Sequence, residues 1–97
     1  GSKVCYVEVK GRNRNLDNAY PLPIAARKMV KLCDKKMPGI IIWDCFDGII
    51  YANVNDIEGT CRIGGRKARE GSHNDIECML YFNKQTNLFE VKKDLLP

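Results

Sequence analysis

The sequence has a single histidine, His73, and none of its five cysteines lies in a C-x-x-C pair. Both absences argue against a zinc site, because structural zinc is held by closely spaced Cys and His ligands. The odd number and wide spacing of the cysteines also argue against a disulfide framework. Thiols inside apolar runs behave as small hydrophobic groups, so we expect a reducing, cytoplasmic setting.

Long apolar runs are also missing. No stretch approaches the ~18 residues of a membrane span, and no signal peptide is recognisable. The 97 residues, of which 44% are hydrophobic, suit one small domain over residues 3–97. Residues 1–2 are typical of an expression-tag scar. A net charge of +4, from 16 basic and 12 acidic residues, permits contact with phosphates without requiring it.

The first predicted element is a strand over residues 3–10, which alternate and are rich in valine and tyrosine. Successive side chains of a strand point to opposite faces. We therefore place Cys5, Val7 and Val9 on the core face, and Glu8 and Lys10 together on the other.

Residues 11–18 are polar and predict a loop, and two prolines then predict the entrance of a helix over about residues 24–36. The apolar runs 40–46 and 49–54 flank an Asp-Gly pair and predict a hairpin. Shorter strands are expected at 61–63, 76–82 and 88–91. This order predicts an α/β (α+β) fold, a mixed sheet with one principal helix after the first strand.

Glu8 and Lys10 are the candidate catalytic pair. They are two apart on a strand and project from the same face. Glutamate binds Mg²⁺ or Mn²⁺ through oxygen, and a nearby lysine can orient the attacking water and offset charge on a phosphate. The metal itself acts as a Lewis acid and lowers the pKa of its bound water. Such a group suits phosphodiester hydrolysis.

The same acid-x-lysine pattern recurs at Asp34 to Lys36 and at Glu90 to Lys92. The first repeat falls at a helix end, where the two side chains diverge. Glu90 with Lys92 stays open as an alternative, because Asp75 lies fifteen residues earlier and a hairpin would bring the two acids together. Context favours Glu8, since its strand runs directly into Gly11, Arg12 and Arg14.

The segment from Val7 to Arg12 resembles the second half of the PD-(D/E)xK nuclease signature, found in restriction endonucleases, Holliday-junction resolvases and viral nucleases. The glycine- and arginine-rich stretch from Gly64 to Arg69, followed by Asp75 and Glu77, is similar to small phage and viral members. The resemblance implies a restriction-endonuclease-like core. It implies Mg²⁺ or Mn²⁺ held by Glu8 and the Val9 carbonyl, with Lys10 catalytic and DNA as substrate.

The chain departs from this family in one respect. The family's first metal-binding aspartate precedes the glutamate-lysine strand, and no acidic residue precedes Glu8. We expect that the aspartate was lost with an N-terminal part of the domain, or that another residue replaces it, with Asp44 and Asp75 as candidates, or that the chain is inactive.

The predicted DNA contacts are basic residues of two loops and the helix: Arg12, Arg14, Lys28, Arg66 and Arg69. Each has a simpler structural reading. Gly64 to Arg66 could form a tight turn instead of a phosphate-binding nest, and Asp75 and Glu77 could pair with the arginines. Glu8 and Lys10 could be a solvated cross-strand pair. Trp43 is expected in the core and His73 on the surface.

The prediction is therefore a metal-dependent DNA endonuclease acting on duplex, single-stranded or branched DNA. A homodimer is compatible with it, since paired nicks need two sites. Two alternatives remain open at this stage. One is a non-catalytic nucleic-acid-binding module with the same fold, and the other is a protein-interaction domain.

Overall fold

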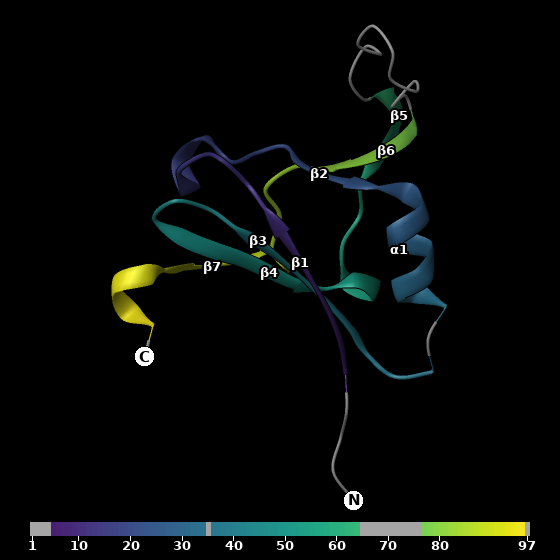
Figure 1. The fold of residues 1–97 in the computed structure, drawn as a ribbon, viewed down its shortest axis with the longest axis horizontal. Helices are drawn as coiled ribbons and strands as arrows, with labels where there is room; N and C mark the ends of the chain where they lie inside the picture. Colours follow the sequence, from purple (N-terminus) through teal and green to yellow (C-terminus); the bar gives the residue numbers. More distant parts are fainter. Residues whose placement is uncertain (1–4, 35, 65–76, 97) are drawn as a thin grey trace, which may run out of the picture.

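The computed structural model describes residues 5–34, 36–64 and 77–96, which form two sheets and one α-helix (Figure 1). The first sheet has the order β1-β3-β4-β7, with β1 Tyr6–Gly11, β3 Gly39–Asp44, β4 Gly48–Asn53 and β7 Phe89–Lys92. The second has the order β2-β6-β5, with β2 Leu22–Ala25, β6 Glu77–Phe82 and β5 Thr60–Gly64. Helix α1 is Ala26–Cys33, and the 3-10 turns are η1 Leu16–Asn18, η2 Val54–Asp56 and η3 Lys93–Leu95.

The first sheet is mixed, since β1 and β3 are parallel whereas β3, β4 and β7 pair antiparallel. A mixed sheet with one principal helix confirms the expected fold class. The hairpin predicted around Asp47 and Gly48 is also confirmed, because β3 and β4 pair directly on either side of it. Two parallel strands require a crossover connection, and the segment between β1 and β3 supplies it with β2 and α1.

Strand β2 is the element that the sequence did not predict. The helix was expected from residue 24, but Leu22 and Ile24 are fully buried side chains of an extended segment that pairs with β6. Pro23 is tolerated there because β2 lies at an edge of its sheet, where one side of the strand needs no N–H donor. Helix α1 is therefore shorter than predicted, and it begins only after this strand.

Trp43 joins the two sheets. Its side chain is fully buried, as predicted, and its ring lies 5.9 Å from that of Phe82 on β6. The indole N–H donates a 2.9 Å hydrogen bond to the Pro23 carbonyl on β2, so the polar atom of this large residue is satisfied. Met29 and Leu32 of α1 extend the same core. The core therefore fills the space between the first sheet, the second sheet and the helix.

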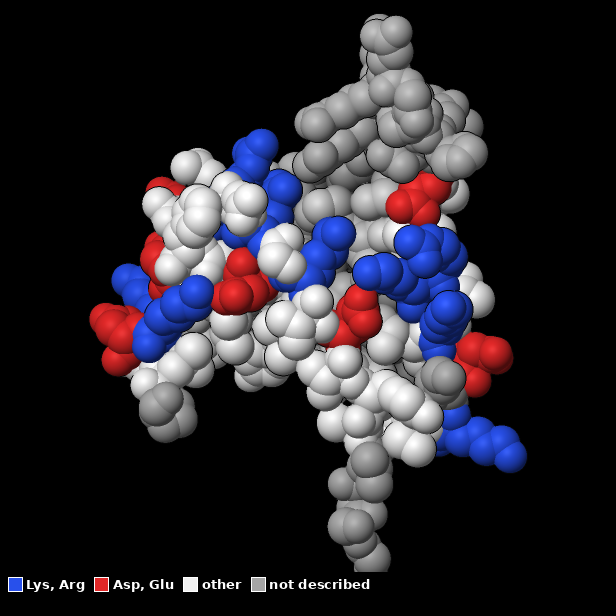
Figure 2. All heavy atoms as spheres, in the orientation of Figure 1, with Lys and Arg blue, Asp and Glu red and all other residues white. Residues whose placement is uncertain are grey.

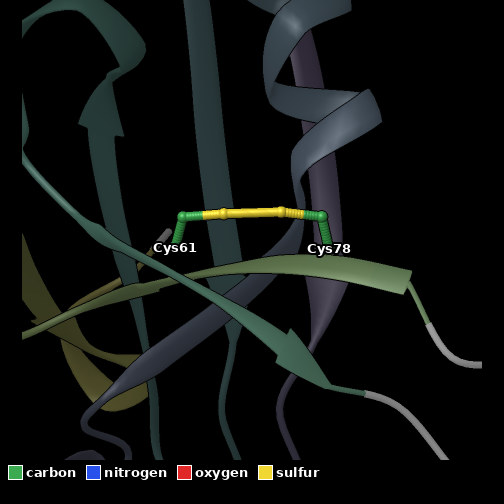
Figure 3. The surroundings of a disulfide bond; sticks show 2 residues. All are labelled: Cys61 and Cys78. Atoms are coloured by element: carbon green, nitrogen blue, oxygen red, sulfur yellow. A yellow bond between two sulfur atoms is a disulfide. The ribbon is translucent and has the colours of Figure 1, made fainter.

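A disulfide links Cys61 on β5 to Cys78 on β6 (Figure 3). The two residues are 17 apart in sequence, and their Cα atoms are 6.7 Å apart. The sequence argued against a disulfide framework and did not anticipate this single pair, because the spacing of the two cysteines carries no signal for it. Only the antiparallel pairing of β5 with β6 brings the two cysteines to the same face in diagonal positions.

Within the described part of the chain, no helix is both long and apolar enough to cross a membrane.

Gly48 is a position where the packing tolerates no side chain. A Cβ there would lie 2.5 Å from the backbone oxygen of Val91 on β7 and 2.5 Å from Leu16 Cδ1. The paired strand cannot move away cheaply, so Gly48→Ala should lower the free energy of unfolding by about 1–3 kcal/mol. Urea denaturation measures this.

Gly11→Ala is the matched control, because a Cβ on Gly11 of the edge strand meets nothing within 4 Å. Equal unfolding midpoints for the two variants would contradict the packing described around Gly48.

Candidate active site

Strand β1 places Glu8 and Lys10 on the inner face of the first sheet. In the parallel register Glu8 lies beside Ile41 and Lys10 beside Trp43, and both of these neighbours are fully buried. Glu8 and Lys10 are themselves half-buried. The prediction that they share one face is confirmed, and that face turns toward α1 and the second sheet.

The assignment of the core face of β1 was wrong. Val7 and Val9 are 50% and 61% exposed, and Cys5 is exposed as well. The alternation of the strand was read correctly, but the helix and the second sheet pack on the side that carries the charged residues. Because β1 lies at the sheet edge, Glu8 and Lys10 keep access to solvent there.

The backbone hydrogen bonds of β1 show in which direction the Val9 carbonyl points. The N–H groups of Tyr6 and Arg12 both bond to carbonyls on the β3 side of the strand, those of Pro38 and Asp44. Along a strand, the main-chain N–H and C=O groups of successive residues point alternately to one neighbouring strand and to the other side. The main-chain groups of the even-numbered residues of β1 therefore point toward β3. The carbonyl of Val9 therefore points to the open edge of the sheet, next to the Glu8 side chain.

Helix α1 brings basic side chains to Glu8. The ammonium of Lys28 lies 3.2 Å from Glu8 Oε1. Arg27, Lys28 and Lys31 line one cleft of about 240 Å³ together with Glu8, and basic side chains gather over α1 in Figure 2. Lys28 was among the predicted DNA contacts, with Lys31 as a further possibility, whereas Arg27 was predicted only to lie on the exposed side of the helix. Lys31 is four residues from Arg27 and three from Lys28, and these spacings place the three residues on neighbouring positions of the helix surface.

The donor set at Glu8 suits a hard divalent cation. A carboxylate and an adjacent main-chain carbonyl are oxygen ligands, and Mg²⁺ is commonly held by one or two carboxylates together with waters and substrate phosphates. Asp44 cannot supply a second carboxylate here. It pairs in register with Gly11, which puts it on the outer face of the sheet, and it lies 2.9 Å from the Lys93 ammonium. Asp75 lies outside the described residues.

The two arginines that follow β1 differ in their surroundings. Arg12 is half-buried, and its guanidinium donates to the carbonyls of Ala19 at 2.9 Å and Pro21 at 3.3 Å. Burial, followed by the nearby charge of Arg14, lowers the pKa of Arg12 from its usual value. Arg14 is exposed and makes one longer contact, 3.4 Å to the Asn18 carbonyl. Arg12 therefore braces the loop after β1, and Arg14 is the more accessible cation.

The alternative motif, Glu90 with Lys92, occupies a separate cleft of about 420 Å³. The Glu90 carboxylate accepts a 2.8 Å hydrogen bond from the Tyr20 hydroxyl and lies 3.4 Å from the Lys84 ammonium. Burial, together with this hydrogen bond, raises the pKa of Tyr20. Glu90 thus ties β7 to the loop 70 residues earlier in the chain, which is a structural role.

The remaining predicted contacts, Arg66 and Arg69, lie outside the described residues, as does His73. Glu77, at the start of β6, is described. Its carboxylate lies 3.1 Å from Arg27 Nε on α1. The pairing anticipated for Glu77 with Arg66 or Arg69 lies outside the described residues.

A comparison with protein families matches residues 1–91 to a family described as "Phage putative PDDEXK endonuclease". Comparisons with curated proteins and with solved structures find no match. The matched region includes β1 with Glu8 and Lys10, the helix, and the strands that carry Trp43 and Glu90.

The Glu8–Lys28 ion pair is expected to add little to stability. The two side chains are 33% and 43% exposed, and exposed pairs contribute about 0.2–1 kcal/mol once solvent screening is included. A double-mutant cycle with Glu8→Gln and Lys28→Gln, followed by urea unfolding, should give a coupling energy in that range.

A coupling well above about 1 kcal/mol would contradict this account. It would show that the pair holds the helix to β1 and is not a separable part of the candidate site.

Proposed function

The chain belongs to the phage PDDEXK endonuclease family, and we propose that it hydrolyses DNA phosphodiester bonds with Mg²⁺ or Mn²⁺ at Glu8. One observation carries the proposal. Glu8 and Lys10 lie together on the inner face of an edge strand, where the Val9 carbonyl reaches the open edge and α1 adds three basic side chains.

In this proposal, Glu8 and the Val9 carbonyl hold the cation. The bound ion supplies Lewis acidity and a water of lowered pKa. Lys10, one strand period beyond Glu8, orients the water and offsets the charge that develops on the phosphate. Lys10 is itself half-buried and pairs in register with Trp43, whose side chain is fully buried.

The basic residues are proposed to hold the nucleic acid. Arg27, Lys28 and Lys31 lie in the cleft that contains Glu8. A phosphate bound by these three residues would therefore lie close to the Glu8 carboxylate and the metal proposed to bind there. Arg14 extends this surface at the end of β1, and Arg12 supports it by fixing the loop. Arg66 and Arg69 remain proposed contacts from the sequence.

A non-catalytic nucleic-acid-binding module is the second candidate function. Within the described ranges, no three His, Cys, Asp or Glu side chains gather in a way that could hold a metal ion. A chain that binds DNA equally with and without divalent cation, and never cleaves it, would favour this alternative.

The first test of the metal site is Mn²⁺ binding by calorimetry. Glu8→Gln keeps the side-chain shape but removes the carboxylate. It should weaken Mn²⁺ binding by at least about 10-fold, since changing even an outer partner of a metal ligand costs that much. Mg²⁺-dependent cleavage of DNA should fall by about 100-fold or more in Glu8→Gln and in Lys10→Met.

Glu90→Gln is the matched control. It alters the second acid-x-lysine motif in the same way, and it should leave both Mn²⁺ binding and cleavage unchanged. If Mn²⁺ binding and cleavage were lost in Glu90→Gln but retained in Glu8→Gln, the active site would lie at Glu90 on β7. Equal binding in all three proteins would overturn the metal site at Glu8.

DNA binding should weaken steeply as salt rises, because Lys and Arg contacts to phosphates release counterions. Each phosphate contact adds about 0.9 to the slope of log affinity against log salt concentration on duplex DNA. The double variant Lys28→Gln with Lys31→Gln should therefore lower the slope by roughly 2. Fluorescence anisotropy at several salt concentrations measures this.

Lys84→Gln is the control for this experiment, because Lys84 is exposed but lies in the cleft of Glu90. If Lys84→Gln lowered the slope as much as a helix variant does, the cleft beside Glu8 would not be the DNA-binding surface.

A further inference from the structure

The carboxylate proposed as a metal ligand already has a cationic partner. The Lys28 ammonium on α1 lies 3.2 Å from Glu8 Oε1. Lys10, which shares the acid-x-lysine motif with Glu8, makes no ion pair within the described ranges. The cation that neutralises Glu8 therefore comes from the helix and not from its own strand.

This contact follows from how α1 is held. Met29 and Leu32 anchor the helix in the core, and this brings the neighbouring Lys28 to the inner face of β1. The two charged side chains remain partly exposed, 43% for Lys28 and 33% for Glu8, and exposed ion pairs are weak. The pair therefore forms because the backbone positions the two residues, and another ion can separate it at little cost.

A divalent cation at Glu8 would compete with Lys28 for the same carboxylate. An ammonium and a metal ion are both cations, and two positive charges a few ångströms apart repel each other. A doubly charged ion also attracts the carboxylate more strongly than a single ammonium does. Lysine carries its charge on a flexible stem, so a displaced ammonium can move to a new anionic partner within the same cleft.

The other basic residues of the cleft are placed differently. Arg27 is paired with Glu77 on β6, 3.1 Å away, and Lys31 has no acidic partner among the residues that the structure describes. Of these three cations, Lys28 is the one neutralised by the proposed metal ligand. The availability of Lys28 for a phosphate therefore depends on what else is bound at Glu8.

On the basis of the proposed metal site at Glu8, we propose that Lys28 is a displaceable counter-ion that couples metal binding to DNA binding. Lys28 pairs with Glu8 while no divalent cation is bound there, and it pairs with a DNA phosphate once a cation has displaced it. Binding linkage is reciprocal, so DNA that takes up Lys28 strengthens metal binding by the same factor. The size of the effect is that of an exposed ion pair, about 2- to 5-fold.

The first test is calorimetric titration of Mn²⁺ into the whole chain and its variants. Lys28→Gln removes the competing ammonium, so it should tighten Mn²⁺ binding by about 2- to 5-fold. Lys28→Arg keeps a cation at the same position and should bind Mn²⁺ as the wild-type chain does.

Two controls separate competition at Glu8 from a general effect of charge. Lys31→Gln removes one positive charge from the same cleft but no partner of Glu8, so it should tighten Mn²⁺ binding clearly less than Lys28→Gln does. Lys84→Gln removes the lysine partner of Glu90 and should leave the affinity for Mn²⁺ unchanged. Circular dichroism should show that all variants are folded.

The second test is the effect of Mn²⁺ on the affinity for duplex DNA. Fluorescence anisotropy measures it in the Lys10→Met background, in which we expect cleavage to be slow. The gain in DNA affinity caused by Mn²⁺ should be about 2- to 5-fold larger with Lys28 in place than in Lys28→Gln.

The outcomes separate this coupling from the proposed function. If Glu8→Gln weakens Mn²⁺ binding but Lys28→Gln does not tighten it, the coupling is overturned and the metal site stands. Equal tightening in Lys28→Gln and Lys31→Gln, or an equal gain in DNA affinity with and without Lys28, would also overturn the coupling. A chain that binds no Mn²⁺, or binds it independently of Glu8, would overturn the proposed metal site and the coupling with it.

Discussion

The position of Trp43 is the constraint on which the other packing depends. Its ring fills the space between the sheets against Phe82, and its N–H reaches the Pro23 carbonyl. Its neighbour in the parallel register is Lys10. Trp43 therefore contacts the second sheet and lies on β3, the strand that pairs with the one carrying the candidate catalytic pair. A small domain buries little surface, so a fully buried residue as large as Trp43 is a substantial part of its core.

This packing gives the first sheet two different faces. On the inner side, apolar residues of β3 and β4 meet the core, and β1 at the edge contributes Glu8 and Lys10. Both charged side chains are half-buried, because β3 pairs with β1 on one side while the other side of β1 is the edge of the sheet. On the outer side, the same strands present valine, isoleucine and aromatic side chains. The two faces of one sheet thus differ in chemical character.

The site itself combines few groups of complementary kinds. In the proposed site, the Glu8 carboxylate and the Val9 carbonyl are the oxygen ligands and Lys10 is the catalytic lysine, while Arg27, Lys28 and Lys31 of α1 line the cleft that contains Glu8. Glu90 and Lys92 have the same spacing, and both glutamates pair with a lysine, Lys28 at Glu8 and Lys84 at Glu90. They differ in that Glu90 also accepts a hydrogen bond from Tyr20, whereas Glu8 lies on an edge strand beside the basic side chains of α1. The short pattern alone does not show this difference.

The sequence by itself determined the local features. Period-two alternation predicted that Glu8 and Lys10 share a face, the Asp-Gly pair predicted the β3–β4 hairpin, and the motif pointed to the nuclease family. These depend on neighbours in the chain. Only the tertiary structure decided which face of β1 is covered, that residues 22–25 are a strand, and that Cys61 meets Cys78. The tertiary structure also decided that Lys28 lies beside Glu8. Each of these features depends on segments that are distant in sequence. Alternation along a strand fixes which side chains share a face, but it does not fix what packs against that face.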